Sequence, residues 1–431
     1  MNVIAQIENK DYGAILKRPA STQGEVDDVV ASIIKRVAQG GDSALRELSL
    51  EFDGSAPDAF EIPREQLQDA AKIIDPDLKK AINNAISNIT TFHQAQLPRP
   101  VSVETQPGLI CSLRYEPIPK IGLYIPGGTA PLFSSVLMTA VPATLAGCRE
   151  IIACTPPGAT PEMLYAFSLF NIRVFAIGGA QAIAAMAFGT ETVPKVDKVF
   201  GPGNAYVTSA KMQMAGRGLA IDMPAGPSEV MVIADHTANP AFVAADLLSQ
   251  AEHGHDSQVI LLATSAEIID ATLLHVEKQL QSLPREGTAR KALEQSLAIC
   301  VKDMAQAIEI SNFYGPEHLI LSVDDFHRVA EHINNAGSVF LGNYTPESAG
   351  DYASGTNHTL PTGGFTNAWS GITTAAFMKS ITFQEMSREG LAKLAPTVVH
   401  MARAEQLDAH ANAILVRTGD SSENILFKSL V

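Results

Sequence analysis

The sequence has few aromatic residues and few cysteines. Aromatic residues make up 6% of the 431 residues, and only one residue is tryptophan. There are four cysteines, and their spacing contains neither a CxxC pair nor a disulfide framework. We therefore expect reduced cysteines that pack as small apolar residues, as is usual in a cytoplasmic protein.

Long apolar runs and positive charge are also scarce. No uninterrupted run approaches the roughly 18 apolar residues of a membrane span, and the first residues lack the apolar core of a secretion signal. Basic residues number 31 against 46 acidic ones, which gives a net charge of −15. An excess of negative charge argues against nucleic acid and anionic membranes as partners. We expect a cytoplasmic protein whose partners are small molecules.

Alternating strands and helices dominate the middle of the chain. The first hundred residues are predicted to be helical, and residues 25–39 place Val29, Ile33 and Val37 on one stripe before a glycine pair. From Lys120 onward, apolar strands alternate with helices, and this rhythm restarts at residue 229. Continuous apolar strands separated by helices predict parallel sheets with helices on both faces. The sequence therefore predicts two successive α/β modules.

Two segments depart from that rhythm. Residues 343–372 form a long, polar, glycine-rich stretch with hardly any periodicity, and a loop of that length inside a compact protein is usually functional. The chain after it returns to a helical pattern, which we expect to continue through the tail.

Glycine-containing turns connect strands to helices three times in the first module, at residues 125–128, 178–181 and 201–204. Each turn places bare backbone N–H groups at a helix N-terminus, which suits a phosphate. Any one of them is equally well explained as a tight turn that needs glycine. Three at the carboxyl ends of strands favour a nucleotide crevice, although the chain has no GxGxxG fingerprint.

Nine of the eleven histidines lie between residues 253 and 410. Four of them stand in segments with other candidate polar groups: Gln250 and His253, Glu317 and His318, Asp351 and His358, Glu405 and His410. Taken alone, each segment has an ordinary explanation, such as a capped helix end, an exposed turn or a polar loop. The last pair is awkward for a shared site, because positions five apart on a helix diverge by about 140°.

Taken together, these segments supply amide, carboxylate and imidazole ligands without cysteine. That set is compatible with zinc or manganese in a site that keeps open positions. The adjacent Glu317 and His318 offer two groups for proton transfer near neutral pH. The spacing is not the HExxH pattern of zinc proteases and is not diagnostic by itself.

Several long segments resemble the histidinol dehydrogenase family, and the likeness covers nearly the whole chain. The segments are IGLYIPGGTAPLFSSVLM, GGAQAIAAMAFGT, DKVFGPGNAYV, IDMPAGPSEV, DLLSQAEHGHDSQ, SNFYGPEHL, SAGDYASGTNHTLPTGG and AEQLDAHANAI. The resemblance implies oxidation of L-histidinol through bound L-histidinal to L-histidine with two NAD⁺, the last steps of histidine biosynthesis. It also implies one zinc ion per active site and a homodimer with exchanged terminal segments.

The resemblance further implies a fold of two incomplete Rossmann-like domains with parallel sheets, a helical amino-terminal region and a helical tail. We expect an arm over residues 1–20, a discontinuous domain with the metal and catalytic residues over 21–123 and 229–372, and an NAD-binding domain over 124–228. Residues 373–431 would form the helical tail that is exchanged between subunits.

Roles carried over from the family fall on individual positions of this chain. The implied metal ligands are Gln250, His253, Asp351 and His410. The implied proton-transfer pair is Glu317 and His318. The implied substrate contacts are Ser228, His358 and Glu405, together with His318 and the four metal ligands. The implied NAD contacts are Tyr124, Gln181 and Asn204.

In the mechanism implied by the family, zinc holds the amine and imidazole of the substrate, His318 takes the hydroxyl proton, and Glu317 later activates water. An alternative is a dehydrogenase on the same scaffold that acts on another small alcohol, such as a sulfonated diol. A second alternative is a zinc hydrolase that uses Glu317 as base without a nicotinamide cofactor. The residues at Ser228, His358 and Glu405 favour histidinol.

Overall fold

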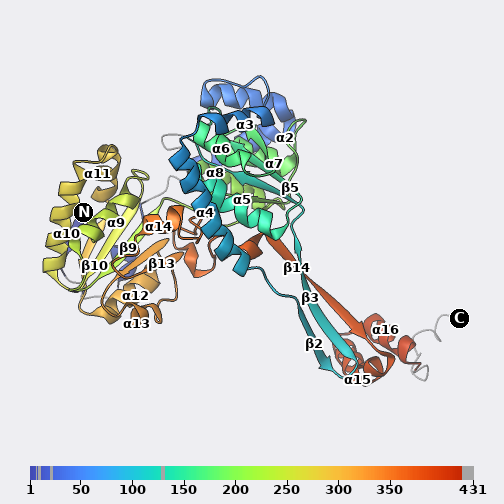
Figure 1. Ribbon diagram of the computed structural model, residues 1–431. Helices are drawn as coiled ribbons and strands as arrows, with labels where there is room; N and C mark the ends of the chain where they lie inside the picture. The colour runs from blue at the N-terminus through green and yellow to red at the C-terminus, as the bar shows by residue number, and fades with distance from the viewer. Residues whose placement is uncertain (6, 8–10, 20–22, 128–131, 420–431) are drawn as a thin grey trace. The chain divides into compact units, whose positions relative to one another are not determined.

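The computed structural model describes residues 1–431 except residues 6, 8–10, 20–22, 128–131 and 420–431 (Figure 1). Parts of the expected arm and tail, and Gly128 of the first glycine turn, therefore lie outside the described residues. The chain divides into two compact units. One comprises Met1–Gln96 and Ile118–Phe377, and the other comprises Leu97–Pro117 and Met378–Val431.

The first unit contains a parallel six-stranded sheet with the order β1-β11-β10-β9-β12-β13. Its strands are β1 (Asn2–Ile4), β9 (Glu229–Ala234), β10 (Gln258–Ala263), β11 (Leu297–Cys300), β12 (His318–Ser322) and β13 (Ser338–Leu341). Its helices are α1 (Tyr12–Ile15), α9 (Pro240–Ala251), α10 (Ala266–Leu280), α11 (Glu286–Glu294), α12 (Met304–Tyr314), α13 (Phe326–Ala330) and α14 (Glu347–Tyr352). The central strands are buried on both faces, which explains their unbroken apolar sequence.

The first unit also contains a parallel five-stranded sheet with the order β6-β5-β4-β7-β8. Its strands are β4 (Lys120–Tyr124), β5 (Glu150–Thr155), β6 (Arg173–Ala176), β7 (Lys198–Phe200) and β8 (Ala220–Ile221). The helices between them are α5 (Ser134–Ala146), α6 (Pro161–Ser168), α7 (Gly179–Phe188) and α8 (Ala205–Ala215). The predicted pair of α/β modules with parallel sheets is therefore confirmed.

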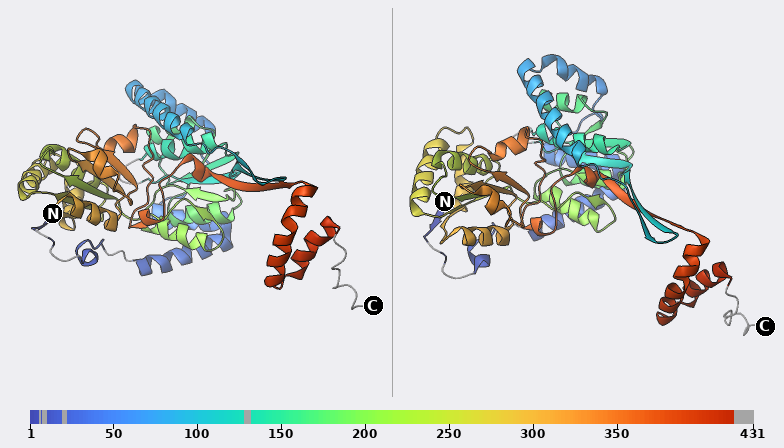
Figure 2. Two further views of the ribbon diagram at one scale, coloured as in Figure 1. Left: turned by 90° about the horizontal axis from the view of Figure 1, so that it is seen from below. Right: turned by 60° about the horizontal axis from the view of Figure 1, so that its bottom comes forward.

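The amino-terminal helices α2 (Gln23–Asp53), α3 (Arg64–Ile73) and α4 (Pro76–Ala95) pack on helices of the five-stranded sheet. Figure 2 shows these blue helices beside the green ones. The domain division predicted from the sequence instead joins residues 21–123 to residues 229–372. The apolar side chains of α2 explain the difference, because Val30, Ile34 and Val37 belong to one core cluster with α7 and α8.

The predicted stripe of α2 is correct at Ile33 and Val37 and wrong at Val29, which is 44% exposed. The predicted stop at the glycine pair takes the form of a kink. Gly41 has a φ of +49°, and helical structure resumes after it.

The second unit holds an antiparallel sheet with the order β14-β3-β2, followed by two helices. Its elements are β2 (Val101–Gln106), β3 (Leu109–Pro117), β14 (Met378–Met386), α15 (Arg388–Ala404) and α16 (Asp408–Thr418). The expectation that the tail is helical throughout is wrong, because residues 378–386 pair with β3. The single helix expected across Glu405 and His410 is also wrong. Gln406 has a φ of +58°, which ends α15 before α16 begins.

The long polar stretch at 343–372 is only partly a loop. It contains α14 and a short 3₁₀ turn at Phe365–Asn367, and a second 3₁₀ turn follows at Thr374–Phe377. None of the helices in the described part of the chain is both long and apolar enough to span a membrane.

Candidate active site

Polar groups from three of the four predicted segments meet at the amino edge of the six-stranded sheet. Strands β9 and β12 are neighbours, with His318 paired to Val230, so the first residues of both strands lie at this edge. Helix α9 follows β9 and runs back toward the start of the sheet, because a crossover helix runs antiparallel to its strands. The end of α9 therefore brings Gln250 to Glu317 and His318.

Hydrogen bonds hold these three side chains together. The Nε2 amide of Gln250 lies 2.9 Å from Nδ1 of His318 and donates to Oε2 of Glu317 at 3.4 Å. The backbone N–H of Glu229 donates to the same Oε2 at 2.9 Å, and its carbonyl oxygen lies 3.1 Å from His318 Nδ1. All four residues are buried. Among the described residues, His318 Nε2 has no hydrogen-bond partner.

A cluster of three possible metal ligands adjoins this group. One ligand atom from each of His253, Glu347 and Asp351 lies within 4.8 Å of the others. Within the described part of the chain, the Gln250 carbonyl Oε1 and both carboxylate oxygens of Glu347 are buried without a hydrogen-bond partner. Buried polar atoms are normally satisfied, so these orphaned oxygens indicate a site for a cation. Imidazole, carboxylate and amide donors fit a zinc ion.

The charges around His318 shift the pKa values of the site. Burial alone would lower the pKa of His318, but the charges of Glu317 and Glu347 outweigh it and raise the pKa well above its ordinary value. Burial raises the pKa of Glu347 to about 8. Burial would also raise the pKa of Asp351, but interaction with His318 outweighs it and leaves that pKa lowered. The site is a dense set of mutually dependent charges, which is typical of catalytic centres.

The imidazole of His358 lies next to this cluster. Its Nδ1 is 2.9 Å from the carbonyl oxygen of Asp351, and its Nε2 is 3.1 Å from the hydroxyl of Ser135 on α5. Burial lowers the pKa of His358, which favours the neutral imidazole. Ser228 is half-buried and directly precedes Glu229 at the start of β9.

The three predicted NAD contacts lie at the carboxyl edge of the five-stranded sheet. Tyr124 ends β4, and its hydroxyl accepts a hydrogen bond from the Gly179 N–H at 3.0 Å. Gln181 is buried in the first turn of α7. Asn204 caps α8 by accepting hydrogen bonds from the N–H groups of Tyr206 and Val207, both at 3.1 Å.

The third glycine turn is the most tightly built of the three. Gly201 has a φ of +122°, and a Cβ added there would collide with the carbonyl oxygen of Tyr124. Asp222 accepts a hydrogen bond from the Gly201 N–H at 2.7 Å, and Lys211 donates to the Gly201 carbonyl at 3.1 Å. Lys211 and Asp222 also form a buried ion pair. This turn requires glycine for its geometry, whatever it binds.

Glu405 and His410 lie in the second unit and are exposed there. Glu405 is the residue that ends α15, and His410 lies in the first turn of α16. Because the helix breaks between them, the divergence expected for one continuous helix does not apply.

The sequence alone does not reveal Glu347, Glu229 or Arg18 as residues of the site. Glu347 lies four residues before Asp351 on α14 and therefore shares its face, but in a segment predicted to be a loop that spacing has no meaning. Glu229 begins an apolar strand, where a charged residue is unusual. Arg18, which pairs with Glu229, stands in a segment without any periodic signal.

Comparisons with known proteins agree over nearly the full length. The sequence model of the family described as histidinol dehydrogenase matches residues 16–418. Histidinol dehydrogenase of Vibrio parahaemolyticus is 51% identical over 97% of this chain and 98% of its own length. The Escherichia coli K12 enzyme of that name is 53% identical over 95% of each chain.

A solved structure agrees with the sequence comparison. The crystal structure of histidinol dehydrogenase from Elizabethkingia anophelis superposes with a TM-score of 0.94 and 46% identity, and the match covers 97% of this chain and 98% of that one. The family match spans residues 16–418, and the identities are near one half over nearly the whole chain. The chain belongs to the histidinol dehydrogenase family.

Proposed function

We propose that this chain carries out its histidinol dehydrogenase activity at the amino edge of the six-stranded sheet, with Glu317 and His318 as the proton-transfer residues. The observation that carries the assignment is the buried group of Gln250, Glu317 and His318 beside a cluster of metal-ligand type. Each member is fixed by a contact with another, which is the preorganisation that acid–base catalysis requires.

Gln250, His253 and Asp351 would hold the Zn²⁺ that this family uses, with His410 as the fourth ligand. The bound ion supplies positive charge that orients the substrate and strengthens its interactions. Glu347 lies within reach of the same position, and burial, together with the neighbouring carboxylates, raises its pKa. Two neutral imidazoles among the ligands make metal binding sensitive to acid.

His318 is the residue we assign to the alcohol. Its Nδ1 is engaged by Gln250 and by the Glu229 carbonyl, whereas Nε2 has no hydrogen-bond partner and lies 3.6 Å from Oδ1 of Asp351. We assign Nε2 to the hydroxyl proton of L-histidinol. The carboxylates that raise the pKa of His318 include Glu347 and Asp351 at the metal position, and a bound cation would offset their charge, so that Nε2 would be free to accept the proton. NAD⁺ accepts a hydride in each of the two oxidation steps.

Glu317 is the residue we assign to water in the second half of the reaction. Both hydrogen bonds to its carboxylate go to Oε2, from Glu229 N–H and from Gln250. We assign the other oxygen, Oε1, to the proton of a water molecule that attacks the bound aldehyde. The resulting gem-diol is the species that is oxidised to L-histidine.

Substrate recognition is assigned to Ser228, His358 and Glu405, in addition to the metal ligands. The neutral state of His358 suits a hydrogen bond to the imidazole or amine of the substrate. The NAD contacts are assigned to Tyr124, Gln181 and Asn204, which stand beside the glycine turns at the carboxyl edge of the five-stranded sheet.

The test is a stoichiometric assay of the purified zinc-loaded protein. With L-histidinol and excess NAD⁺ we expect two NADH for each histidinol consumed, and L-histidine as product. A sulfonated diol, tested in parallel, should give little NADH. NADH formation from the diol and none from histidinol would overturn the proposed function.

We also propose a homodimer in which the second unit serves the partner's site. Its strands carry exposed apolar side chains, among them Val101, Val103 and Phe383, and its helical part carries the exposed Glu405 and His410. Sedimentation should give twice the monomer mass. Mixing Glu317→Gln with His410→Ala subunits should restore part of the activity, because one site of the mixed dimer is then intact. A cytoplasmic location fits the four free cysteines.

A further inference from the structure

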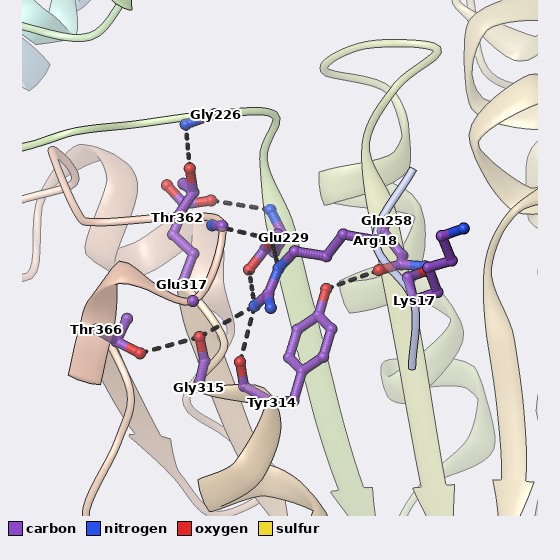
Figure 3. Close-up of polar contacts among 12 residues, drawn as sticks. Lys17, Arg18, Gly226, Glu229, Gln258, Tyr314, Gly315, Glu317, Thr362 and Thr366 are labelled. Carbon is purple, nitrogen blue, oxygen red and sulfur yellow. Dashed lines mark hydrogen bonds and ion pairs between the residues drawn. The ribbon is translucent and has the colours of Figure 1, made fainter. Parts of the chain in front are cut away.

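The amino-terminal arm reaches the candidate site through Arg18 (Figure 3). Arg18 Nε donates to Oε1 of Glu229 at 2.5 Å, and Nη2 donates to Oε2 at 3.1 Å. Glu229 is 3% exposed, whereas the arginine side chain is 27% exposed. The two parallel N–H···O bonds are the bidentate geometry that only arginine provides.

The same guanidinium also holds the segment that leads to Glu317. Nη2 of Arg18 donates to the carbonyl oxygen of Tyr314 at 2.8 Å, and the guanidinium lies 3.8 Å above the Tyr314 ring. The next carbonyl, that of Gly315, accepts a hydrogen bond from the Thr366 hydroxyl at 3.0 Å. Arg18 therefore contacts the turn that ends two residues before Glu317.

Glu229 connects this arginine to the catalytic candidates. Its carboxylate Oε1 accepts a hydrogen bond from the Gly363 N–H at 3.1 Å, which ties in the loop after His358. Its own peptide N–H and carbonyl are the groups that contact Glu317 and His318. Movement of Glu229 would therefore move the hydrogen-bond partners of both catalytic side chains at once.

The positive charge of Arg18 also affects the pKa of Glu229. Burial raises the pKa of Glu229, and the nearby charge of Glu317 raises it further, while Arg18 acts in the opposite direction. Without the guanidinium, the buried Glu229 carboxylate would lose its described ion-pair partner, while the like charge of Glu317 would remain nearby. A buried carboxylate that loses its partner reorients, takes up a proton or admits water.

We propose that Arg18 is a positioning residue of the reaction, which acts through Glu229 to hold Glu317 and His318 in their working geometry. The inference rests on the proposed function of those two residues. Arg18 contacts them only through Glu229 and the 314–315 turn, so it is assigned no contact with substrate or NAD⁺.

The first measurement compares zinc-loaded Arg18→Met with Lys17→Met. Lys17 is exposed, and the described contact of that residue uses its backbone carbonyl, which accepts from Gln258. We expect kcat of Arg18→Met to fall on the order of 10–10²-fold for both histidinol and histidinal, with the KM values little changed, because a displaced catalytic group slows chemistry more than binding. Lys17→Met should behave as the parent.

A second measurement separates positioning from general stability. Because Arg18 is partly exposed, millimolar guanidinium should restore part of the kcat of Arg18→Ala, while methylammonium should not. Arg18→Lys should recover less than the parent, since an ammonium cannot make the bidentate contact. In a double-mutant cycle, Arg18→Met combined with Glu229→Gln should be no slower than the slower single variant.

Three results would overturn the inference: equal kcat for Arg18→Met and Lys17→Met, failure of guanidinium to raise kcat of a folded Arg18→Ala, or strictly additive losses in the cycle. Should Arg18→Met fail to fold, Arg18→Lys and the rescue of Arg18→Ala decide the question. If the parent itself does not oxidise histidinol, the proposed function fails instead, and the two failures are thereby distinguished.

Discussion

The two parallel sheets of the first unit differ in the edge at which their candidate functional groups gather and in the kind of group found there. The six-stranded sheet gathers buried charged side chains at its amino edge, where Glu229 and His318 begin their strands. The five-stranded sheet places glycine turns at its carboxyl edge, where Tyr124 and Phe200 end theirs. Open α/β sheets usually bind ligands at the carboxyl edge. The NAD⁺ site proposed for the five-stranded sheet follows this rule, and the catalytic site proposed for the six-stranded sheet departs from it.

The difference shows what each edge can do. A carboxyl edge delivers backbone N–H groups and helix N-termini, which suit a phosphate and need few particular side chains. An amino edge has the ends of the returning helices, such as α9, and must supply its chemistry through side chains. Burial of those side chains requires compensation by hydrogen bonds and opposite charges, which the Gln250, Glu229 and Arg18 contacts provide.

Removal of the metal should disable only the chemistry assigned to the amino edge of the six-stranded sheet. This is the largest effect we expect. A strong chelator should abolish turnover and leave the fold intact, because the two large cores do not depend on one ion. His253→Ala and His410→Ala should each lower the zinc content. The measurements are zinc by atomic absorption, circular dichroism and NADH formation. Full activity after verified metal removal would exclude the metal role.

Glu405→Gln tests whether the second unit supplies a charge to the substrate. We expect histidinol binding to weaken by about 1.5–3 kcal/mol, the range for a hydrogen bond to a charged group. NAD⁺ binding, which is assigned to the other edge, should hardly change. Calorimetric titration with each ligand measures both. Equal losses for the two ligands would show that Glu405 has a structural role.

Gly201→Ala tests the glycine turns at the carboxyl edge of the five-stranded sheet. The positive φ and the clash with the Tyr124 carbonyl should cost about 1–3 kcal/mol of strain, expressed as weaker NAD⁺ binding with histidinol binding retained. Gly158→Ala is the matched control, because Gly158 has a φ of +83° and nothing within 4 Å of an added Cβ. Similar NAD⁺ affinities for the two variants would remove Gly201 from the dinucleotide site.

A smaller effect is expected where the two sheet regions meet. His93 on α4 approaches Asn357, which donates to the Met138 carbonyl of α5. Burial lowers the pKa of His93 to about 4, below the ordinary value near 6.5. Between these values the unfolded chain binds a proton that the folded chain does not, so stability falls as the pH drops from 6.5 to 4.

In His93→Gln that contribution is absent. The urea concentration at the midpoint of unfolding should therefore decrease less between pH 7 and pH 5 than it does in the parent. The difference should correspond to the binding of at most one proton. His255→Gln, at an exposed position, is the control. An unchanged pH dependence in His93→Gln would show that another group causes the loss.

The sequence predicts the parallel sheets well, because buried strands such as 230–234 and 259–263 are unbroken apolar runs between helices. Antiparallel strands are harder to predict. Residues 378–386 are mostly exposed, so they carry no apolar pattern, and only their pairing with β3 makes them a strand.

Prediction of the site succeeds where a motif is local and fails where a contact is long-range. Glu317 and His318 are adjacent in the chain, and Gln250 and His253 share a helix end, so their types and spacing are visible. Arg18 and Glu229 are 211 positions apart, and nothing in either segment indicates the other. Glu347 can be recognised as a residue of the site only when its segment is known to be helical.

The most direct test of the central claim is single-turnover NADH formation by Glu317→Gln, with excess enzyme and either L-histidinol or L-histidinal. The variant keeps the size and hydrogen bonding of Glu317 but lacks a base. We predict that it oxidises histidinol in the first step and loses about 10²–10⁴-fold in rate with histidinal, whereas His318→Asn slows both. If Glu317→Gln oxidises histidinal as fast as the parent, Glu317 does not activate water and the division of roles at this edge is wrong.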